Sequence, residues 1–486
     1  MISFLIAVCV LIVGYFFLSK ICERIFGADP TRATPAYTHA DGIDFVALPL
    51  WKIFLIQFLN IAGLGPIFGA VAGAMWGPVA FVWIVLGTLL AGGVHDYFSG
   101  MLSVKHKGES ITEISGYYLG SWVKQFMRVF SIILLIMVGT VFIMGPAKIL
   151  MDLTGTNGSL FYWLAVIFIY YVLSTVLPID KLIGKIYPVF GVALLFMALG
   201  IFGMMFYNKL PIPEVTFDNL TNMHHNAAGF PIFPFVFVTI ACGAISGFHA
   251  TQSPLMARCM TNEKQGKAVF FGTMVTEGIV ALIWAAISMS FFGGVDFLNS
   301  EMSTSGGNAA LIVSTISNSL LGKVGGALAI LGVVAAPITS GDTAFRSARL
   351  IIADLFKYNQ TPISNRLIIA APLFIIALGL LSLDFSIIWR YFAWTNQTLA
   401  TVVLWTVTAY LIKEKKFYWI SFFPAVFMTA VVVTYIFIAP EGLHLGKNVS
   451  YMTGILVAIG SFIATLVFVK RQKSPELKKL EEVDVN

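Results

Sequence analysis

The sequence predicts an all-α membrane protein with about thirteen transmembrane helices, and three observations predict this fold. Hydrophobic residues make up 58% of the chain and charged residues 11%, whereas about a quarter of a soluble domain is charged. Apolar stretches of about 20 residues, long enough to span a bilayer, recur along the whole chain. Lys and Arg gather in alternate connections between these stretches, which is typical of a chain threaded repeatedly through a membrane.

The predicted spans are 2–19, 48–75, 77–103, 126–150, 160–177, 186–207, 231–257, 268–292, 321–345, 365–383, 386–412, 417–439 and 451–470. The first is interpreted as a retained helix, because it lacks the basic start and small-residue cleavage site of a signal peptide. The charged tail after Ser474 is expected to be a solvated helix or disordered. The four cysteines, at positions 9, 22, 242 and 259, show neither metal nor disulfide spacing.

The distribution of positive charge predicts the orientation. Connections after the odd-numbered spans, together with the C-terminal tail, hold most of the 30 Lys and Arg residues. The opposite connections hold only Lys148, Lys209, Lys323 and Lys447. Cytoplasmic loops carry such an excess, so we expect an outside N-terminus and a cytoplasmic C-terminus in the cytoplasmic (inner) membrane. The net charge of +6 is then a topology signal, and no nucleic-acid partner is expected.

Two of the predicted spans are interrupted by helix-breaking residues. The second contains 60–66, with Gly63, Gly65 and Pro66, and the seventh contains 242–254. Glycine and proline weaken helices, and unpaired backbone at bilayer depth is tolerated only where it is covered by protein or lines a cavity. The sequence therefore predicts a substrate cavity at the two breaks. The candidate substrate-binding residues are Asn60, Gly63, Leu64, Gly65, Gly243, Ser246, Gly247, His249, Gln252 and Arg390.

The two broken spans lie five spans apart, so each opens a five-span unit and the second unit is inverted. This pattern resembles the LeuT architecture of secondary transporters. We expect a 5+5 inverted repeat with one extra N-terminal and two extra C-terminal helices. The predicted units are 1–47 (leading helix and cytoplasmic loop), 48–207 (first repeat), 231–412 (second repeat) and 413–486 (trailing helices and tail). For Gly69 and Gly73, a packing ridge at a helix crossing is the favoured interpretation.

Ionisable residues inside spans are functional candidates, because charge in lipid is costly. Glu277 suits a proton carrier, with pairing to a neighbouring cation as the alternative. His95 and Asp96 suit a proton relay, or they form hydrogen bonds to adjacent loops. His249, beside the second break, suits substrate contact or titration near neutral pH, or is satisfied by a carbonyl.

Arg390 suits an anionic substrate because a guanidinium binds carboxylates bidentately, while snorkelling to the interface is the alternative. In the ninth span, the hydroxyls and carboxylate within 339–343 suit a small hard cation, or a titrating Asp342 in its place. Asp342 also lies one helical turn before Arg346 and could pair with it. The chain has no Walker glycine loop and no His-Glu-x-x-His, so it is not expected to be an enzyme.

The resemblance to LeuT-like transporters implies a coupling-ion site at Ala62, Thr339, Ser340, Asp342 and Thr343, because the corresponding helix supplies hydroxyls there. Asp342 departs from the sodium pattern and favours proton coupling. We therefore expect no cofactor, no metal beyond a coupling sodium, and H⁺ or Na⁺ as the coupling ion. The expected partners are a small-molecule substrate and the lipid bilayer.

Three blocks, 63–70 with 94–103, 243–256 and 338–348, resemble the carbon starvation protein A (CstA) family. The resemblance implies a nutrient importer used during carbon limitation. We expect a cation-coupled importer of small carboxylate-bearing nutrients, with short peptides first and pyruvate/proton symport as the alternative. The half-helices after Gly65 and Gly247 would receive the carboxylate. A passive channel and a starvation sensor are the rivals from other classes.

Overall fold

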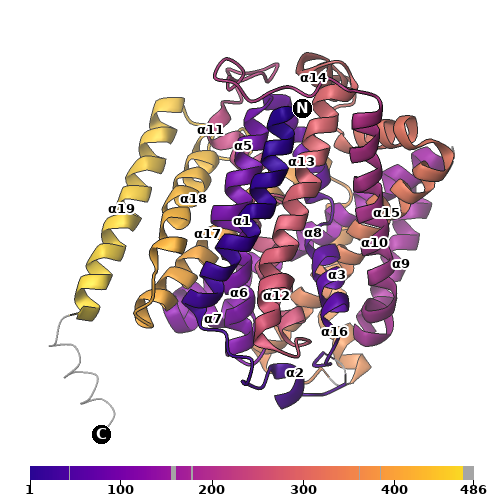
Figure 1. Cartoon of the computed structure of the whole chain (residues 1–486). Helices are drawn as coiled ribbons and strands as arrows, with labels where there is room; N and C mark the ends of the chain where they lie inside the picture. The colour runs from indigo at the N-terminus through magenta and orange to yellow at the C-terminus, as the bar shows by residue number, and fades with distance from the viewer. Residues whose placement is uncertain (43, 155–159, 177–178, 361, 384, 474–486) are drawn as a thin grey trace, which may run out of the picture.

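Helices make up the regular structure of the described chain, and no strand occurs in it (Figure 1). The computed structural model describes residues 1–42, 44–154, 160–176, 179–360, 362–383 and 385–473. The tail after Ser474, predicted to be solvated or disordered, lies outside these residues. The α-helices are α1 Ile2–Phe26, α2 Pro35–Thr38, α3 Leu50–Ile61, α4 Ala70–Gly73, α5 Val79–Leu86, α6 Gly93–Lys105, α7 Ile111–Leu119, α8 Ser121–Thr154, α9 Leu160–Val176, α10 Ile179–Tyr207, α11 Ile232–Thr239, α12 Gly247–Ala257, α13 Thr273–Phe291, α14 Val295–Thr304, α15 Ala309–Phe356, α16 Ile363–Leu380, α17 Phe385–Lys413, α18 Trp419–Ile438 and α19 Lys447–Lys473.

Short π and 3₁₀ turns continue several of these helices. They are η1 Gly65–Gly69, η2 Ala74–Trp76, η3 Gly87–Gly92, η4 Glu263–Gln265 and η5 Lys267–Gly272. Turns of the π type occur frequently at functional sites in helices. Here η3 leads directly into α6, and η5 leads directly into α13.

Within the described residues, eight helices are long and apolar enough to cross a membrane. A ninth span is counted if Leu50–Ile61 and Gly65–Trp76, which meet at a 52° bend, are one broken helix. Every predicted span contains a helix, and the short α2, α7 and α14 lie in the predicted connections. The all-α membrane fold is confirmed, while the count of thirteen crossings and the inverted repeat stay predictions.

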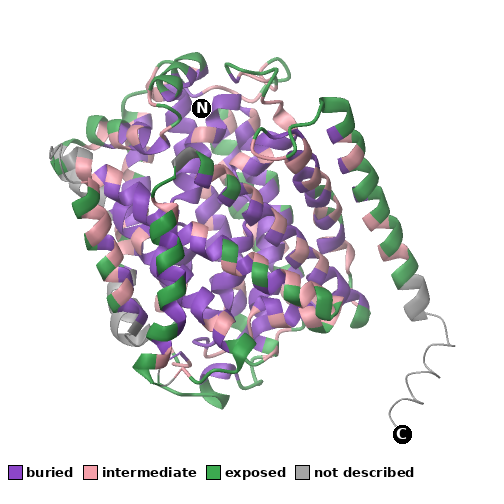
Figure 2. Cartoon of the chain, turned by 180° about the vertical axis from the view of Figure 1, so that it is seen from behind, coloured by how far each residue is buried: buried purple, intermediate pink, exposed green. Residues whose placement is uncertain are grey.

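Buried residues fill the centre of the molecule, and exposed residues lie along the outer helices (Figure 2). The α13 helix is almost entirely buried, whereas α19 stands at the periphery beside α18 and exposes apolar side chains such as Met452, Leu456 and Ile459 (Figure 1). Exposed apolar surface on long helices is what a lipid environment accommodates. A polar site therefore belongs in the interior of the bundle.

The long α15 is bent at Gly322, whose φ of 60° and ψ of −163° are not helical. Glycine tolerates this positive φ because it has no Cβ. The bend separates Ala309–Leu321 from the segment that carries Thr339, Ser340 and Asp342. The predicted ninth span, 321–345, starts at this bend.

Candidate functional site

The two interrupted spans cross each other at their interruptions. A Cβ added to Gly65 would lie 2.0 Å from the Cβ of Cys242, and one added to Gly69 would lie 3.0 Å from the carbonyl oxygen of Thr239. A Cβ on Gly73 would lie 2.2 Å from Cγ1 of Ile240. Missing side chains at these positions allow the two backbones to approach closely. Gly69 and Gly73 thus form the packing ridge that the sequence predicts.

The segment between α11 and α12 is unwound, and neighbouring side chains satisfy its carbonyls. The carbonyl of Ile240 accepts from Trp83 Nε1 at 3.2 Å, and that of Gly243 accepts from Thr88 Oγ1 at 2.9 Å. Gly243 has a φ of 91°, in the left-handed region that favours glycine. Side-chain donors therefore cover backbone that a regular helix would have paired.

The N-terminus of α12 is occupied by a side chain from α17. Oδ1 of Asn396 accepts from the Phe248 backbone N–H at 2.7 Å and from Ser246 Oγ at 3.1 Å. A Cβ on Gly247 would lie 2.5 Å from the Asn396 carbonyl oxygen and 2.5 Å from the Ala400 nitrogen. Asn396 was not among the predicted site residues. The polar run 395–397 within an apolar span was the signal that could have indicated it.

The first break contains buried polar groups without a partner in the described part of the chain. Neither atom of the Asn60 side-chain amide, nor of the Gln57 amide, forms a hydrogen bond there, and both side chains are fully buried. Gly63, Leu64 and Gly65 surround this position and are also buried. A buried amide without partners costs free energy, which a polar ligand could recover.

The hydroxyl row of α15 packs against the same break. Ser340 Oγ donates to the Leu59 carbonyl at 2.9 Å, and a Cβ on Gly63 would lie 3.1 Å from that oxygen. Thr343 Oγ1 donates to the Ser340 carbonyl at 3.0 Å, and Thr339 Oγ1 donates to its own helix. Each hydroxyl donates its proton in these bonds, and a hydroxyl oxygen that donates can also accept. The structure thus brings the Ser340 hydroxyl of the predicted coupling-ion set to the end of α3, next to Ala62, while Thr339 and Thr343 bond within α15.

Asp342 lies on the α9 side of α15. Its carboxylate accepts a hydrogen bond from the Ser174 hydroxyl, and Arg346 Nη2 donates to the Ser174 carbonyl at 3.1 Å. Nη1 of Arg346 also lies 3.8 Å from Oδ1 of Asp44. Asp342 and Arg346, which the sequence suggested as a pair, therefore share Ser174 as a neighbour.

Four predicted ionisable residues meet on the other side of the second break. Asp96 Oδ1 lies 2.7 Å from His95 Nδ1, and Asp96 Oδ2 lies 2.8 Å from His249 Nδ1. His249 Nε2 lies 3.4 Å from Glu277 Oε2. All four side chains are fully buried. Cys242 joins this group, because its Sγ and ligand atoms of His249 and Glu277 all lie within 4.8 Å of one another.

Gln252 and Arg390, which were also predicted to contact substrate, lie elsewhere. Gln252 Nε2 donates to Thr251 Oγ1 at 2.9 Å and to Ser347 Oγ at 3.4 Å, so it faces α15. Arg390 lines a separate cavity of about 260 Å³, and its Nε lies 3.4 Å from Oε2 of Glu441.

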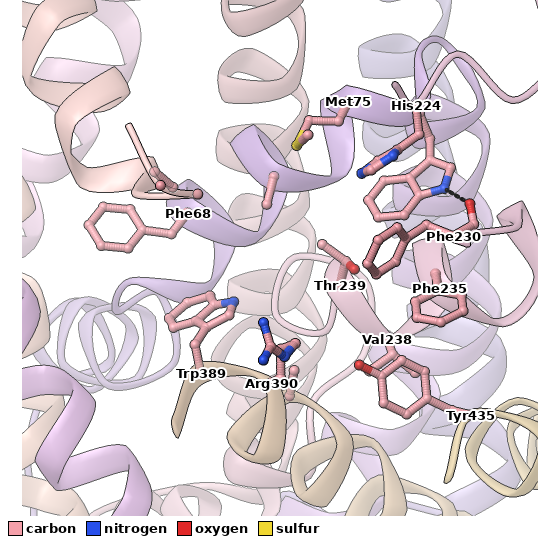
Figure 3. Close-up of a pocket in the computed structure, with 16 residues that line it drawn as sticks. Phe68, Met75, His224, Phe230, Phe235, Val238, Thr239, Trp389, Arg390 and Tyr435 are labelled. Atoms are coloured by element: carbon pink, nitrogen blue, oxygen red, sulfur yellow. Dashed lines mark hydrogen bonds between the residues drawn. The ribbon is translucent and has the colours of Figure 1, made fainter. Parts of the chain in front are cut away.

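Figure 3 shows this cavity, with Arg390 and Trp389 on one side and a group of aromatic rings on the other. Phe68 and Thr239, which flank the two breaks, also line it. Burial of His224, and to a smaller extent the charge of His225, lowers the pKa of His224 to about 4. His224 is therefore neutral at pH 7, and Arg390, paired with Glu441, is the charged residue that lines the cavity.

The family described as carbon starvation protein CstA matches residues 1–161, 148–324 and 302–435. An uncharacterized membrane protein of Haemophilus influenzae is 42% identical over 350 residues, which cover 62% of this chain and 94% of that protein. The peptide transporter CstA of Escherichia coli is 23% identical over 88% of this chain and 79% of its own length. The pyruvate/proton symporter BtsT of Escherichia coli is 26% identical over 57% of this chain and 47% of its own length.

Among solved structures, a manganese transporter of Eremococcus coleocola matches with a TM-score of 0.53 and 13% identity. The match covers 89% of this chain and 99% of that one, and it shows a shared fold. The relatives CstA and BtsT are named as transporters, which agrees with a non-enzymatic secondary transporter embedded in the membrane. The chain belongs to the carbon starvation protein CstA family.

Proposed function

We propose that the protein is a cation-coupled importer of small carboxylate-bearing nutrients, with short peptides as the first candidates. The observation that carries this proposal is the crossing of the two broken spans at their breaks, with buried polar groups beside the crossing. Discontinuous helices that meet at the middle of a membrane protein are the usual binding sites of secondary transporters.

The substrate binds at the first break rather than at the N-terminus of α12. Asn396 already accepts from the Phe248 N–H in the first turn of α12, whereas the buried Asn60 amide has no partner within the described residues. A carboxylate that accepts from the Asn60 side chain would satisfy this donor. Arg390, in the cavity that adjoins both broken spans, attracts the anion before it reaches the break.

The coupling cation binds where α15 meets the end of α3. Ser340, Thr339 and Thr343 offer hydroxyl oxygens there, and Ala62 offers a carbonyl. Oxygen ligands suit a small hard cation such as Na⁺. Asp342, two residues beyond Ser340, is the proton-binding group if the coupling ion is H⁺.

Pyruvate/proton symport is the second candidate. It is supported by the relative of that name and by a buried carboxylate, Asp342, next to the hydroxyl row. Pyruvate carries the same carboxylate as a peptide C-terminus, so the Asn60 position suits both.

Uptake by the purified protein in proteoliposomes tests the proposal. Labelled dipeptide and labelled pyruvate are supplied under an imposed proton gradient, an imposed sodium gradient, or neither. Accumulation above the outside concentration, driven by one gradient and abolished by collapsing it, is expected. Uptake that stops at equal concentrations would indicate a passive channel. Absence of uptake for both substrates under every gradient would contradict the proposed transport.

A further inference from the structure

Cys242 has no part in the proposed transport site, yet it lies against two buried ionisable residues. Cys242 belongs to the unwound segment, His249 to the first turn of α12, and Glu277 to α13. Their ligand atoms lie within 4.8 Å of one another, and the side chains are 2%, 0% and 0% exposed, respectively. Cys242 and His249 lie seven residues apart in one broken span, and the fold brings Glu277 of α13 to them.

We propose that Cys242, His249 and Glu277 form a binding site for one divalent transition-metal ion of the zinc class. A thiolate, an imidazole and a carboxylate are all ligands that zinc accepts. Hard ions such as Mg²⁺, Ca²⁺ and Mn²⁺ prefer oxygen ligands, so the thiolate selects against them. Three protein ligands leave one tetrahedral position for water or another ligand.

The orientation of His249 fits this role. An ionised carboxylate only accepts hydrogen bonds, so the 2.8 Å contact with Asp96 places the proton of His249 on Nδ1. Nε2 then presents a lone pair towards the group. Metal-binding imidazoles almost always donate their second N–H to a carboxylate or carbonyl in this way. Asp96 is itself held by His95 Nδ1 at 2.7 Å, so the orienting group is fixed as well.

The spacing of His249 and Glu277 suits a bound metal ion. Nε2 of His249 and Oε2 of Glu277 lie 3.4 Å apart. Neither of these two atoms forms a hydrogen bond within the described residues. Zinc bond lengths of about 2.0–2.3 Å place tetrahedral ligand atoms roughly 3.3–3.7 Å apart. The imidazole and carboxylate already have this spacing, and Cys242 Sγ lies within 4.8 Å of both, so it reaches the spacing by a shift of at most about 1.5 Å.

A proton shared by His249 and Glu277 is the rival occupant. It would satisfy the same two atoms, and it would make the group part of the predicted relay with His95 and Asp96. The thiol distinguishes the two cases, because a shared proton does not require Cys242. Metal binding does require it and displaces the thiol proton, so that affinity increases with pH.

Cobalt binding to the full-length protein in detergent tests the proposal. We expect about one Co²⁺ per chain after loading, with an intense thiolate-to-cobalt absorption band that Zn²⁺ abolishes. Cys242→Ser should remove this band, whereas Cys259→Ser, the same change at a buried cysteine outside the group, should keep it. Asp96→Asn should weaken the metal affinity by about 10- to 100-fold through loss of the orienting carboxylate.

A measurement on the unaltered protein makes the test independent of variant folding. X-ray absorption of the zinc-loaded chain should show one sulfur ligand at about 2.3 Å among nitrogen and oxygen ligands. No stoichiometric binding, a metal shell without sulfur, or a cobalt band that survives Cys242→Ser would overturn the proposal. Because binding is measured without uptake, these outcomes are independent of the proposed transport.

Discussion

At the scale of single residues, the crossing of the two broken spans depends on the contact between Gly65 and Cys242. A Cβ at Gly65 would meet the Cys242 side chain at 2.0 Å, well inside van der Waals contact. Both residues belong to breaks rather than to regular helix. The packing at this point therefore depends on the absence of one side chain.

Gly65→Ala should destabilise the protein by about 1–3 kcal/mol, because the added methyl overpacks the crossing. Gly379→Ala is the matched control, since a Cβ at this helical position meets nothing within 4 Å. Combining Gly65→Ala with Cys242→Gly should recover part of the loss, because the clashing side chain is removed. Thermal unfolding of the four proteins measures this, and a double variant no more stable than Gly65→Ala would contradict the packing explanation.

Asp342→Asn should abolish concentrative uptake, because the amide keeps the shape of the side chain and loses the charge that a proton or sodium ion requires. Insertion into the membrane should be normal, since the Asn oxygen still accepts from Ser174. Asp296→Asn, at an exposed position of α14, is the control and should accumulate substrate normally. Accumulation by Asp342→Asn at the wild-type ratio would remove Asp342 from the coupling mechanism.

The sequence indicated most of the individual polar residues of the site but not the contacts between them. Glu277, His249 and Asp96 stood out because charge and imidazole are rare in apolar spans. Their contacts join three separate spans, and no spacing along the chain encodes them. Cys242 gave no signal at all, since an isolated cysteine in an apolar segment usually behaves as a small hydrophobic residue.

At the scale of elements, α12 begins inside the molecule, and a side chain of α17 caps an N–H in its first turn. A buried helix end needs a partner for its free N–H groups. Oδ1 of Asn396 supplies one for Phe248. The breaks themselves could be predicted from glycine and proline, but the cap could not, because it comes from a span distant in sequence.

Asn396→Ala should cost about 1–3 kcal/mol, because it leaves the Phe248 N–H buried and unpaired. Asn208→Ala, at an exposed position that bonds only to its own helix, should have little effect. Asn396→Asp should keep the cap and raise the KM for anionic substrates by charge repulsion near the break. Unfolding temperatures and uptake kinetics measure the two effects; a KM unchanged by Asn396→Asp would place the substrate carboxylate beyond the reach of a charge at Asn396, and so away from the crossing of the two breaks.

At the scale of the whole molecule, α14 and α2 lie at opposite ends of the bundle (Figure 1). The N-terminus of the chain lies at the α14 end. Charge distribution in the sequence predicts that the α14 end faces outward and the α2 end faces the cytoplasm. The fold class followed directly from hydrophobicity. The number of crossings did not follow from hydrophobicity. Helices such as α15 and α17 carry polar residues, and composition alone does not tell whether such a helix crosses the membrane or is only buried in the protein.

Cysteine labelling tests this orientation. In a Cys9→Ser background, which removes the one exposed native thiol, Thr304→Cys in α14 and Thr38→Cys in α2 present new exposed thiols. A membrane-impermeant reagent should label Thr304→Cys in intact cells and Thr38→Cys only after permeabilisation. The reverse pattern would invert the predicted topology.

The interlocked breaks also have a mechanical consequence. With the Gly65 backbone seated against Cys242 and that of Gly69 against the Thr239 carbonyl, the two discontinuous spans have no room to slide along each other. We expect the two spans to move as one rigid body when the site changes from facing one side of the membrane to facing the other. A displacement of one broken span would then move the other at the same time. The outward and inward openings of the site would change together rather than one after the other.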